Sequence, residues 1–333
     1  MKKSLLMVVV GCTLFAAAQT SKPLYEQSAK WTIGGEGGWD YLTLSPNGDR
    51  LYVAHSTKIE VIDTTNGEKI GEIPATGAHG TTIVPDQNLG FSSNGRAGTV
   101  TVFDLNSLKP KSEIKVGENP DAIIYDHHSK RVIVMNGRSK DIMVIDPSTL
   151  KIVATIPIGG KLEFAVADAG HIYVNVEDLG EVVAVNSNTW KEEQRWKLTG
   201  CEEPSGLALD NERGELFSVC GNKVMVVLDK KDGKQIATIP TGDGTDAAAF
   251  DPGLKRAFAS NGDGTLTVVQ ENGDKLQVAG TVPTARGART MALDPKTHKI
   301  YLATAELGPP AEGQKRPSIK PGTFFVLVYS PKN

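Results

Sequence analysis

The sequence has few cysteines, no long apolar run after its N-terminus and no excess of charge of either sign. Its 333 residues include 3 cysteines, and 36 Lys and Arg against 39 Asp and Glu give a net charge of -3. Nucleic-acid-binding domains carry a clustered basic surface, and a membrane-spanning helix needs about 20 apolar residues. The composition therefore gives no sign of nucleic-acid binding and predicts no transmembrane segment in the mature chain.

Several common catalytic motifs are also absent. The chain has no Gly-x-Ser-x-Gly elbow, no His-Glu-x-x-His zinc motif and no Cys-x-x-Cys-His heme attachment site. The glycine-rich residues 34–38 do not follow a strand and open a helix, so they do not form a phosphate-binding loop. The motifs therefore do not decide whether this protein is an enzyme.

The N-terminus predicts export. Residues 1–18 combine two lysines, a mostly apolar stretch and three alanines before a cleavage position, which is the pattern of a secretory signal peptide. We therefore expect residues 19–333 to form one mature domain in the periplasm or outside the cell. A lipid anchor is the alternative, because Val9-Val10-Gly11-Cys12 resembles a lipobox, but the apolar run before Cys12 is short and continues past it.

Removal of the signal peptide leaves two cysteines, Cys201 and Cys220. An even number of cysteines in an oxidising compartment predicts one disulfide bond. Two buried free thiols are the alternative, and the repeat described next favours the disulfide because it places both cysteines near the same face.

One sequence pattern recurs along the chain: an apolar strand, a turn with Asp, Pro or Gly, a second and a third strand, an Asn-Gly type turn, and a fourth strand. Equivalent positions in the first turn are separated by 39, 42, 42, 42, 41 and 43 residues. This spacing matches the period of propeller blades built from four strands. The positions are Pro46, Pro85, His127, Ala169, Asn211, Pro252 and Pro295.

The repeat predicts an all-β fold, a seven-bladed β-propeller with four-stranded blades. β-Branched, apolar segments are bounded by turn residues throughout, and helical periodicity is nearly absent. The seventh copy ends after its third strand, whereas residues 29–33 form a spare strand before the first copy. We expect this N-terminal strand to complete the last blade and close the ring, which removes both edge strands.

Several phrases resemble the YVTN-repeat, YncE-like family of bacterial β-propellers. They are KSEIKVGENPD at 111–121, IVATIPIGG at 152–160, IATIPTG at 236–242, TVTVFD at 99–104 and RLYVA at 50–54. The resemblance covers nearly all of residues 30–330 and implies a propeller. It leaves function open, since similar propellers include binding proteins, cell-surface repeats, lactonase-like enzymes and subunits of redox enzymes.

The first strand of each blade lines the channel of a propeller, and the residues that enter it are candidates for a binding site. We call the residue six positions before each turn position a ring residue. The seven ring residues are Asp40, His79, Asp121, Glu163, Ser205, Asp246 and Arg289. We expect these seven side chains to form a ring at the channel mouth. Candidates from adjacent loops are Trp39, Tyr41, His55, Asn94, Arg96, Asn136, Arg138, Asn175, Glu177, Asn222, Asn261, Asp263 and Glu306.

Three interpretations of this ring remain open. Asp40, Asp121, Glu163 and Asp246 offer oxygen ligands for a divalent cation such as calcium, the one cofactor that the sequence suggests. Alternatively, Arg96, Arg138 and Arg289 form a metal-free site for an anion or a sugar acid. The third interpretation is a wet channel mouth whose polar side chains solvate one another.

The sequence therefore predicts an exported binding or scaffold propeller that recognises a small molecule or a protein partner, of unknown identity, on this face. The alternative is a metal-assisted, lactonase-like hydrolase that uses a cation in the channel. A further possibility is a subunit of a periplasmic redox assembly.

Overall fold

Short β-branched segments between Gly, Asn and Asp turns form strands throughout the chain, as their composition favours. The computed structural model describes residues 24–310, 313 and 317–332. The predicted signal peptide and the alternative lipidation position Cys12 lie outside these residues. In the described part, no helix has the length and apolar character needed to cross a membrane.

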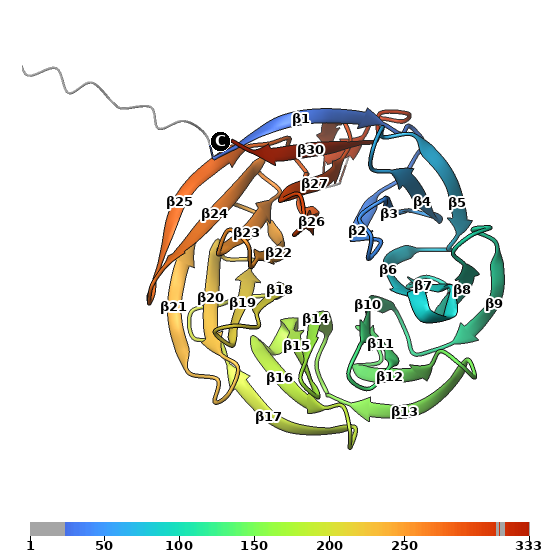
Figure 1. The fold of residues 1–333 in the computed structure, drawn as a ribbon, viewed down its shortest axis with the longest axis horizontal. Coiled ribbons are helices and arrows are strands. Elements are labelled where there is room, and N and C mark those ends of the chain that lie inside the picture. Colours follow the sequence, from blue (N-terminus) through green and yellow to red (C-terminus); the bar gives the residue numbers. More distant parts are fainter. Residues whose placement is uncertain (1–23, 311–312, 314–316, 333) are drawn as a thin grey trace, which may run out of the picture.

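The described residues form seven antiparallel sheets of four strands, arranged as blades around a central channel (Figure 1). The first blade contains β2 (Trp39–Leu44), β3 (Arg50–His55), β4 (Lys58–Asp63) and β5 (Lys69–Pro74). The second contains β6 (Ala78–Val84), β7 (Leu89–Asn94), β8 (Thr99–Asp104) and β9 (Pro110–Lys115). The third contains β10 (Pro120–Asp126), β11 (Arg131–Asn136), β12 (Asp141–Asp146) and β13 (Lys151–Pro157).

The remaining blades repeat this order from the channel outward. The fourth contains β14 (Leu162–Asp168), β15 (His171–Val176), β16 (Glu181–Asn186) and β17 (Lys191–Lys197). The fifth contains β18 (Pro204–Asp210), β19 (Glu215–Cys220), β20 (Val224–Asp229) and β21 (Gln235–Pro240). The sixth contains β22 (Thr245–Asp251), β23 (Arg256–Asn261), β24 (Thr265–Asn272) and β25 (Lys275–Pro283). The seventh contains β26 (Thr290–Asp294), β27 (Lys299–Thr304), β30 (Phe325–Pro331) and β1 (Tyr25–Thr32).

Few elements lie outside the blades. Two 3-10 turns, η1 (Pro85–Gln87) and η2 (Glu177–Leu179), occur among the described residues. The insertion between the second and third strands of the seventh blade contains a short hairpin, β28 (Leu307–Pro310) and β29 (Pro317–Ile319). Ile319 packs on the apolar cluster between the first and seventh blades, so the end of this insertion lies against the body of the ring.

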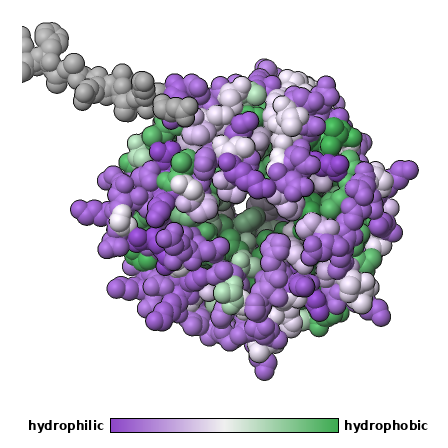
Figure 2. Space-filling view, viewed as in Figure 1, coloured by the Kyte–Doolittle hydropathy of each residue, from purple (hydrophilic) through white to green (hydrophobic). Residues whose placement is uncertain are grey.

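The structure confirms the predicted seven-bladed propeller and its repeat register. Each predicted turn position lies between the first and second strands of its blade, from Pro46 after β2 to Pro295 after β26. The first strands are innermost, and Figure 2 shows a hollow at the centre of the face in view, with apolar residues in its depth. The sequence period therefore places equivalent residues at one level of the channel.

An N-terminal strand closes the ring, as the sequence predicts. β1 pairs antiparallel with β30 from Tyr25 opposite Pro331 to Thr32 opposite Phe325, so the strand begins earlier than the expected Ala29. The Tyr25 ring is buried and packs edge-on against Phe258 of the sixth blade, with centroids 5.5 Å apart. The closing strand therefore contacts the neighbouring blade as well as its own sheet.

The closing strand contacts the next blade in the same way as the outermost strand of the fourth blade does, through a tryptophan packed on a glycine. Trp31 of β1 packs on Gly67 in the last turn of the first blade, where an added Cβ would lie 2.2 Å from the indole. Trp196 of β17 packs in the same way on Gly233 of the fifth blade, with a distance of 2.1 Å. The first and seventh blades are thus joined by a contact that the fourth and fifth blades also use.

The predicted disulfide is present between Cys201 and Cys220. It joins the loop that enters β18 to the end of β19, across a sequence separation of 19 residues. Closing a loop of this size in the unfolded chain stabilises the fold by about 3 kcal/mol in the chain-entropy treatment.

A buried carboxylate, that of Glu60, lies beside the seam between the first and seventh blades. The His55 ring stacks on Phe324 of the seventh blade with centroids 4.1 Å apart, and its Nδ1 lies 3.1 Å from Glu60 Oε1. Glu60 is 1% exposed and also contacts Lys58 at 3.3 Å and Lys69 at 2.7 Å. Burial raises the pKa of Glu60, but the hydrogen bonds from His55 and Lys69 and the lysine charges outweigh it and lower the pKa to about 2.

We predict that removing β1 destabilises the whole propeller. Tyr25→Ala should lower the free energy of unfolding by about 3 kcal/mol, because a large aromatic ring leaves a cavity, and a chain that starts after Thr32 should lose more. Thermal unfolding followed by circular dichroism measures both. A chain that starts at Leu24 and keeps β1 is the control, and equal melting temperatures for all three chains would contradict the closing role of this strand.

We also predict an acid-dependent loss of stability from Glu60. A group whose pKa falls from 4.5 in the unfolded chain to about 2 when folded stabilises the fold above pH 4.5 and loses this contribution as the pH falls through 2. The full contribution is about 3 kcal/mol, from 1.36 kcal/mol per pKa unit.

Urea unfolding between pH 6 and pH 2 compares the wild type with Glu60→Gln and with Glu68→Gln, an exposed carboxylate on the same blade. The wild type and Glu68→Gln should lose stability toward low pH more steeply than Glu60→Gln. Parallel pH profiles for the wild type and Glu60→Gln would show that Glu60 does not contribute in this way.

Candidate functional site

A local irregularity of the innermost strands positions the side chains at the channel mouth. In the first six blades, the pairing of the first with the second strand shifts at the ring position, for example between Trp39 and Leu42 and between Ala78 and Thr81. Bulges of this kind bend a strand and change the direction of a side chain, and they are common beside functional sites. In the seventh blade, Arg289 directly precedes β26.

All seven predicted ring residues lie on the wall of one cavity of about 580 Å³ at the channel mouth. We call it the mouth cavity. Its wall consists of Asp40, Tyr41, His79, Asp121, Lys161, Glu163, Glu177, Glu203, Ser205, Gly221, Gly244, Thr245, Asp246 and Arg289. The structure thus brings the ring together, and its role in binding stays a prediction.

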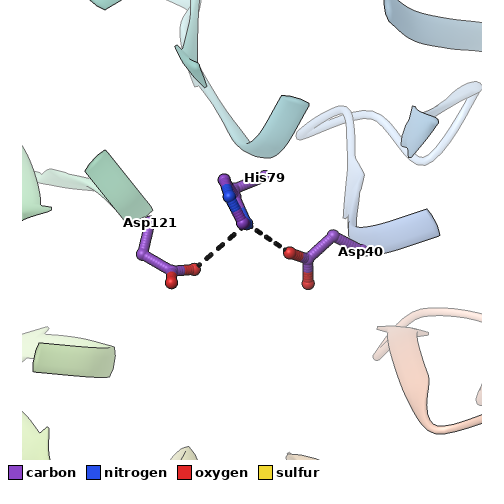
Figure 3. Close-up of side chains that lie close together, drawn as sticks. All are labelled: Asp40, His79 and Asp121. Atoms are coloured by element: carbon purple, nitrogen blue, oxygen red, sulfur yellow. Dashed lines mark hydrogen bonds and ion pairs between the residues drawn. The ribbon is translucent and has the colours of Figure 1, made fainter. Parts of the chain in front are cut away.

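His79 lies between two carboxylates from the neighbouring blades (Figure 3). Its Nδ1 is 2.5 Å from Asp40 Oδ2 and 3.5 Å from Asp121 Oδ1. The other edge of the ring rests on Gly95, where an added Cβ would lie 2.5 Å from Nε2. The ligand atoms of His79, Asp40 and Asp121 all lie within 4.8 Å of one another, so this cluster can hold a metal ion.

Burial and neighbouring charges shift the pKa values of this cluster in opposite directions. Burial alone would lower the pKa of His79, but the hydrogen bond to Asp40 and the charges of Asp121 and Asp40 raise it to about 9. Burial and the charge of Asp40 raise the pKa of Asp121 well above its usual value, against the charge of His79. Asp121 is 7% exposed, and the contact with His79 at 3.5 Å is its closest ionic contact in the described structure.

Five further charged residues of the mouth cavity, Lys161, Glu163, Glu177, Asp246 and Arg289, pair among themselves. Lys161 Nζ contacts Glu163 Oε1 at 2.8 Å and also bonds Glu177. Arg289 Nε donates to Asp246 Oδ2 at 2.6 Å. Burial still raises the pKa of Glu163, helped by the charge of Asp121, and raises that of Asp246 against Arg289. The four carboxylates expected from sequence to bind one cation therefore do not form one cluster. Glu163 pairs with Lys161 and Asp246 pairs with Arg289, whereas Asp40 and Asp121 both contact His79.

Most of the loop candidates do not lie on the cavity wall. Glu177 and Tyr41 do, whereas Trp39 is buried between the first and seventh blades against Phe324. The buried loop asparagines bond within the protein: Asn94 to Thr101 at 2.8 Å, for example, and Asn175 to the Ser205 carbonyl at 2.9 Å. Asn136 and Asn261 bond their own hairpins in a similar way, and Asn222 bonds the Gly200 carbonyl and the Glu202 amide.

Four charged loop candidates are exposed and separate from the cavity. Arg96, Arg138, Asp263 and Glu306 are outside its wall, and Glu306 pairs instead with Lys320 at 3.2 Å. Of the three arginines in the anion interpretation, Arg289 alone lines the cavity. The described geometry therefore gives no convergent arginine site.

Sequence reasoning named Tyr41 as a candidate but missed Phe164, whose ring packs against it. Tyr41 and Phe164 follow the ring positions of the first and fourth blades, and their rings lie 5.2 Å apart. Tyr41 lines both the mouth cavity and a second cavity of about 530 Å³ farther along the inner strands, which Phe164 also lines. The residues at the equivalent positions of the other blades are small: Gly80, Ala122, Gly206, Ala247 and Thr290. This contrast in residue size at equivalent positions is the sequence signal that could have identified the pair.

The sequence model of one family, the Cytochrome D1 heme domain, matches residues 50–247, which is more than half of the chain. The chain belongs to the Cytochrome D1 heme domain family. The match extends from β3 into β22, and the resemblance to YVTN-repeat propellers is compatible with it but stays a prediction. No curated protein sequence matches the chain.

Solved structures share the fold at low sequence identity. Hydrazine synthase of Kuenenia stuttgartiensis aligns with a TM-score of 0.68 and 18% identity, over 86% of this chain and 96% of that chain. U3-55K aligns with a TM-score of 0.75 and 11% identity, over 91% and 98%. The WD40 repeats of RRP9 align with a TM-score of 0.74 and 11% identity, over 91% of this chain and 100% of that chain. At these identities the similarity supports the propeller fold and nothing finer.

The family name implies heme, and the mouth cavity does not fit one. Its wall carries six carboxylates, one phenol and one imidazole, whereas a heme presents broad apolar faces. The one imidazole, that of His79, directs its Nδ1 at the carboxylates of Asp40 and Asp121, whose charges occupy the space that the porphyrin plane would need.

The second cavity is apolar, and its potential iron ligands are limited to the Met291 thioether and the phenols of Tyr41 and Tyr125. Its wall includes no histidine and no cysteine. Burial raises the pKa values of its phenols Tyr41 and Tyr125, which disfavours the phenolate form. Neither of these two cavities therefore combines apolar walls with a histidine or cysteine ligand, as a typical heme site does.

Proposed function

We propose that this protein is an exported binding propeller that holds a small polar ligand in the mouth cavity. The observation that carries the proposal is the convergence of charged side chains from equivalent positions of different blades on one cavity of about 580 Å³. This volume lies in the range of small-molecule sites, about 300–1,000 Å³. A structural role alone does not require charged groups from separate blades to be buried together.

The charge of the wall indicates which ligands suit it. Six carboxylates face three cationic side chains, those of His79, Lys161 and Arg289. Lys161 and Arg289 each bond carboxylates on their own side of the cavity, which leaves Asp40 and Asp121 to share His79. Buried carboxylates are stabilised by hydrogen-bond donors and positive charge. The wall therefore favours a ligand with amine or hydroxyl groups over an anion.

Two features support export. Residues 1–18 have the composition of a signal peptide. The Cys201–Cys220 disulfide is of the kind that persists in oxidising compartments such as the periplasm. Both features are compatible with a protein that meets its ligand outside the cytoplasm.

We predict that the metal-free protein binds small amines in preference to anions. Calorimetric titration after chelation compares a short polyamine, a polyol and a dicarboxylate of similar size. Saturable binding of the amine or the polyol, weakened at least about tenfold by Asp246→Asn through loss of one charged hydrogen-bond acceptor, is the expected result. Asp86→Asn, an exposed carboxylate outside the cavity wall, should bind like the wild type.

Preferential binding of the dicarboxylate, or identical affinities of the wild type and Asp246→Asn, would contradict the proposal. Lack of saturable binding by all three compounds would contradict it as well.

Metal-assisted hydrolysis of a lactone or an ester is a second candidate. It is favoured by the cluster of Asp40, His79 and Asp121, which lies at the open cavity where a bound cation would contact substrate. We predict that, under this function, zinc-loaded protein hydrolyses simple lactones and that Asp121→Asn abolishes turnover. Absence of turnover by the loaded wild type would leave the binding function as the remaining candidate.

A further inference from the structure

The cluster of Asp40, His79 and Asp121 has the arrangement of a metal site rather than of a completed ion pair. The three residues occupy the second position of β2, β6 and β10, so consecutive blades hold them at one level of the channel. Three side chains from three separate sheets converge with ligand atoms within 4.8 Å of one another (Figure 3). Their backbone positions are fixed by the ring, so little chain ordering is needed on binding.

The distances suit a small cation after minor side-chain adjustment. Zinc ligands lie 2.0–2.2 Å from the metal, which puts tetrahedral donor atoms about 3.3 Å from one another. His79 Nδ1 is 2.5 Å from Asp40 and 3.5 Å from Asp121, on either side of this value. All three ligand atoms lie within 4.8 Å of one another, so side-chain adjustment can bring them to this spacing around an ion.

The cluster has too little positive charge to compensate its two carboxylates. A single imidazole faces two carboxylates, and Asp121 is nine-tenths buried with its closest ionic contact among the described residues at 3.5 Å, to His79. The nearby cations are engaged elsewhere, Lys161 with Glu163 and Glu177, and Arg289 with Asp246. An ion of charge two in the cluster would compensate both Asp40 and Asp121.

The donor atoms select the kind of metal. Calcium prefers six to eight oxygen ligands, whereas imidazole nitrogen suits zinc and similar transition metals. Three protein ligands beside an open cavity match zinc sites that keep one position for water or substrate. The Gly95 backbone against the other edge of the imidazole holds Nδ1 toward the carboxylates.

We infer that Asp40, His79 and Asp121 bind one zinc ion, whose fourth position faces the mouth cavity. This inference rests on the proposed function, since the ion would lie in the same binding cavity. It replaces the all-oxygen calcium site that the sequence suggests with a mixed nitrogen and oxygen site of three ligands.

The test is zinc titration of the purified, tag-free protein after chelation, with bound metal counted by mass spectrometry. We expect one zinc per chain and weaker binding of calcium. His79→Gln and Asp121→Asn should each bind zinc at least about 100-fold more weakly, since loss of a ligand exceeds the 10–100-fold effect of outer-shell changes. His171→Gln is the matched control, because it removes an imidazole paired with Glu193 at 3.0 Å outside the cavity wall.

A spectroscopic arm keeps the test valid if a variant does not fold. Cobalt titrated into the wild type should give the visible absorption bands of a tetrahedral site, and one equivalent of zinc should remove them. Lack of saturable zinc binding by folded wild type, or equal zinc binding by the wild type and both ligand variants, would overturn the inference. If amines bind to the metal-free protein and zinc does not, the proposed function stands and the zinc site is wrong. If zinc binds but neither the amine nor the polyol does, the zinc site stands and the proposed function is wrong.

Discussion

The pairing of β1 with β30 is the interaction on which the rest of the structure depends. It completes the seventh sheet with the chain's first strand and joins the two ends of the ring. A propeller positions its innermost strands through contacts between neighbouring blades, so an open ring would leave the channel residues without fixed partners. The Trp31 contact with Gly67 and the Tyr25 contact with Phe258 hold this joint to the blades on either side.

Ring closure has an electrostatic consequence at the channel mouth. Equivalent positions of a closed ring lie at one level, so charged residues at these positions meet whether or not they attract. Shifted pairing at the start of the inner strands occurs there in the first six blades. The resulting group of carboxylates is partly buried, has raised pKa values at Asp121, Glu163 and Asp246, and is incompletely matched by cations. This imbalance is the physical basis of the proposed ligand and metal preferences.

The fold was predictable from sequence because its information is periodic. Turn residues such as Pro46 and Pro295 recur at nearly constant spacing, and the same register identifies every ring residue from Asp40 to Arg289. The closing strand was predictable because the last copy lacks a fourth strand. The disulfide followed from cysteine count and register, which place Cys201 and Cys220 near one face.

Partner choice within the site was not predictable in this way. The register shows that His79 and Glu163 share a level, but side-chain length and local neighbours decide that Lys161 pairs with Glu163 and that His79 pairs with Asp40. Asn94 and Asn261 were expected at the mouth, yet their amides bond strand hydroxyls inside the blade. The same Asn-Gly chemistry serves a hairpin or a ligand, and sequence alone does not separate the two uses.

The most direct measurement is an anomalous-difference map from crystals of the protein grown with zinc, collected on both sides of the zinc absorption edge. Our account predicts one peak in the mouth cavity, within bonding distance of Asp40, His79 and Asp121. A mouth cavity without a peak in a crystal where the protein is fully folded, or a peak held by other residues, would contradict it.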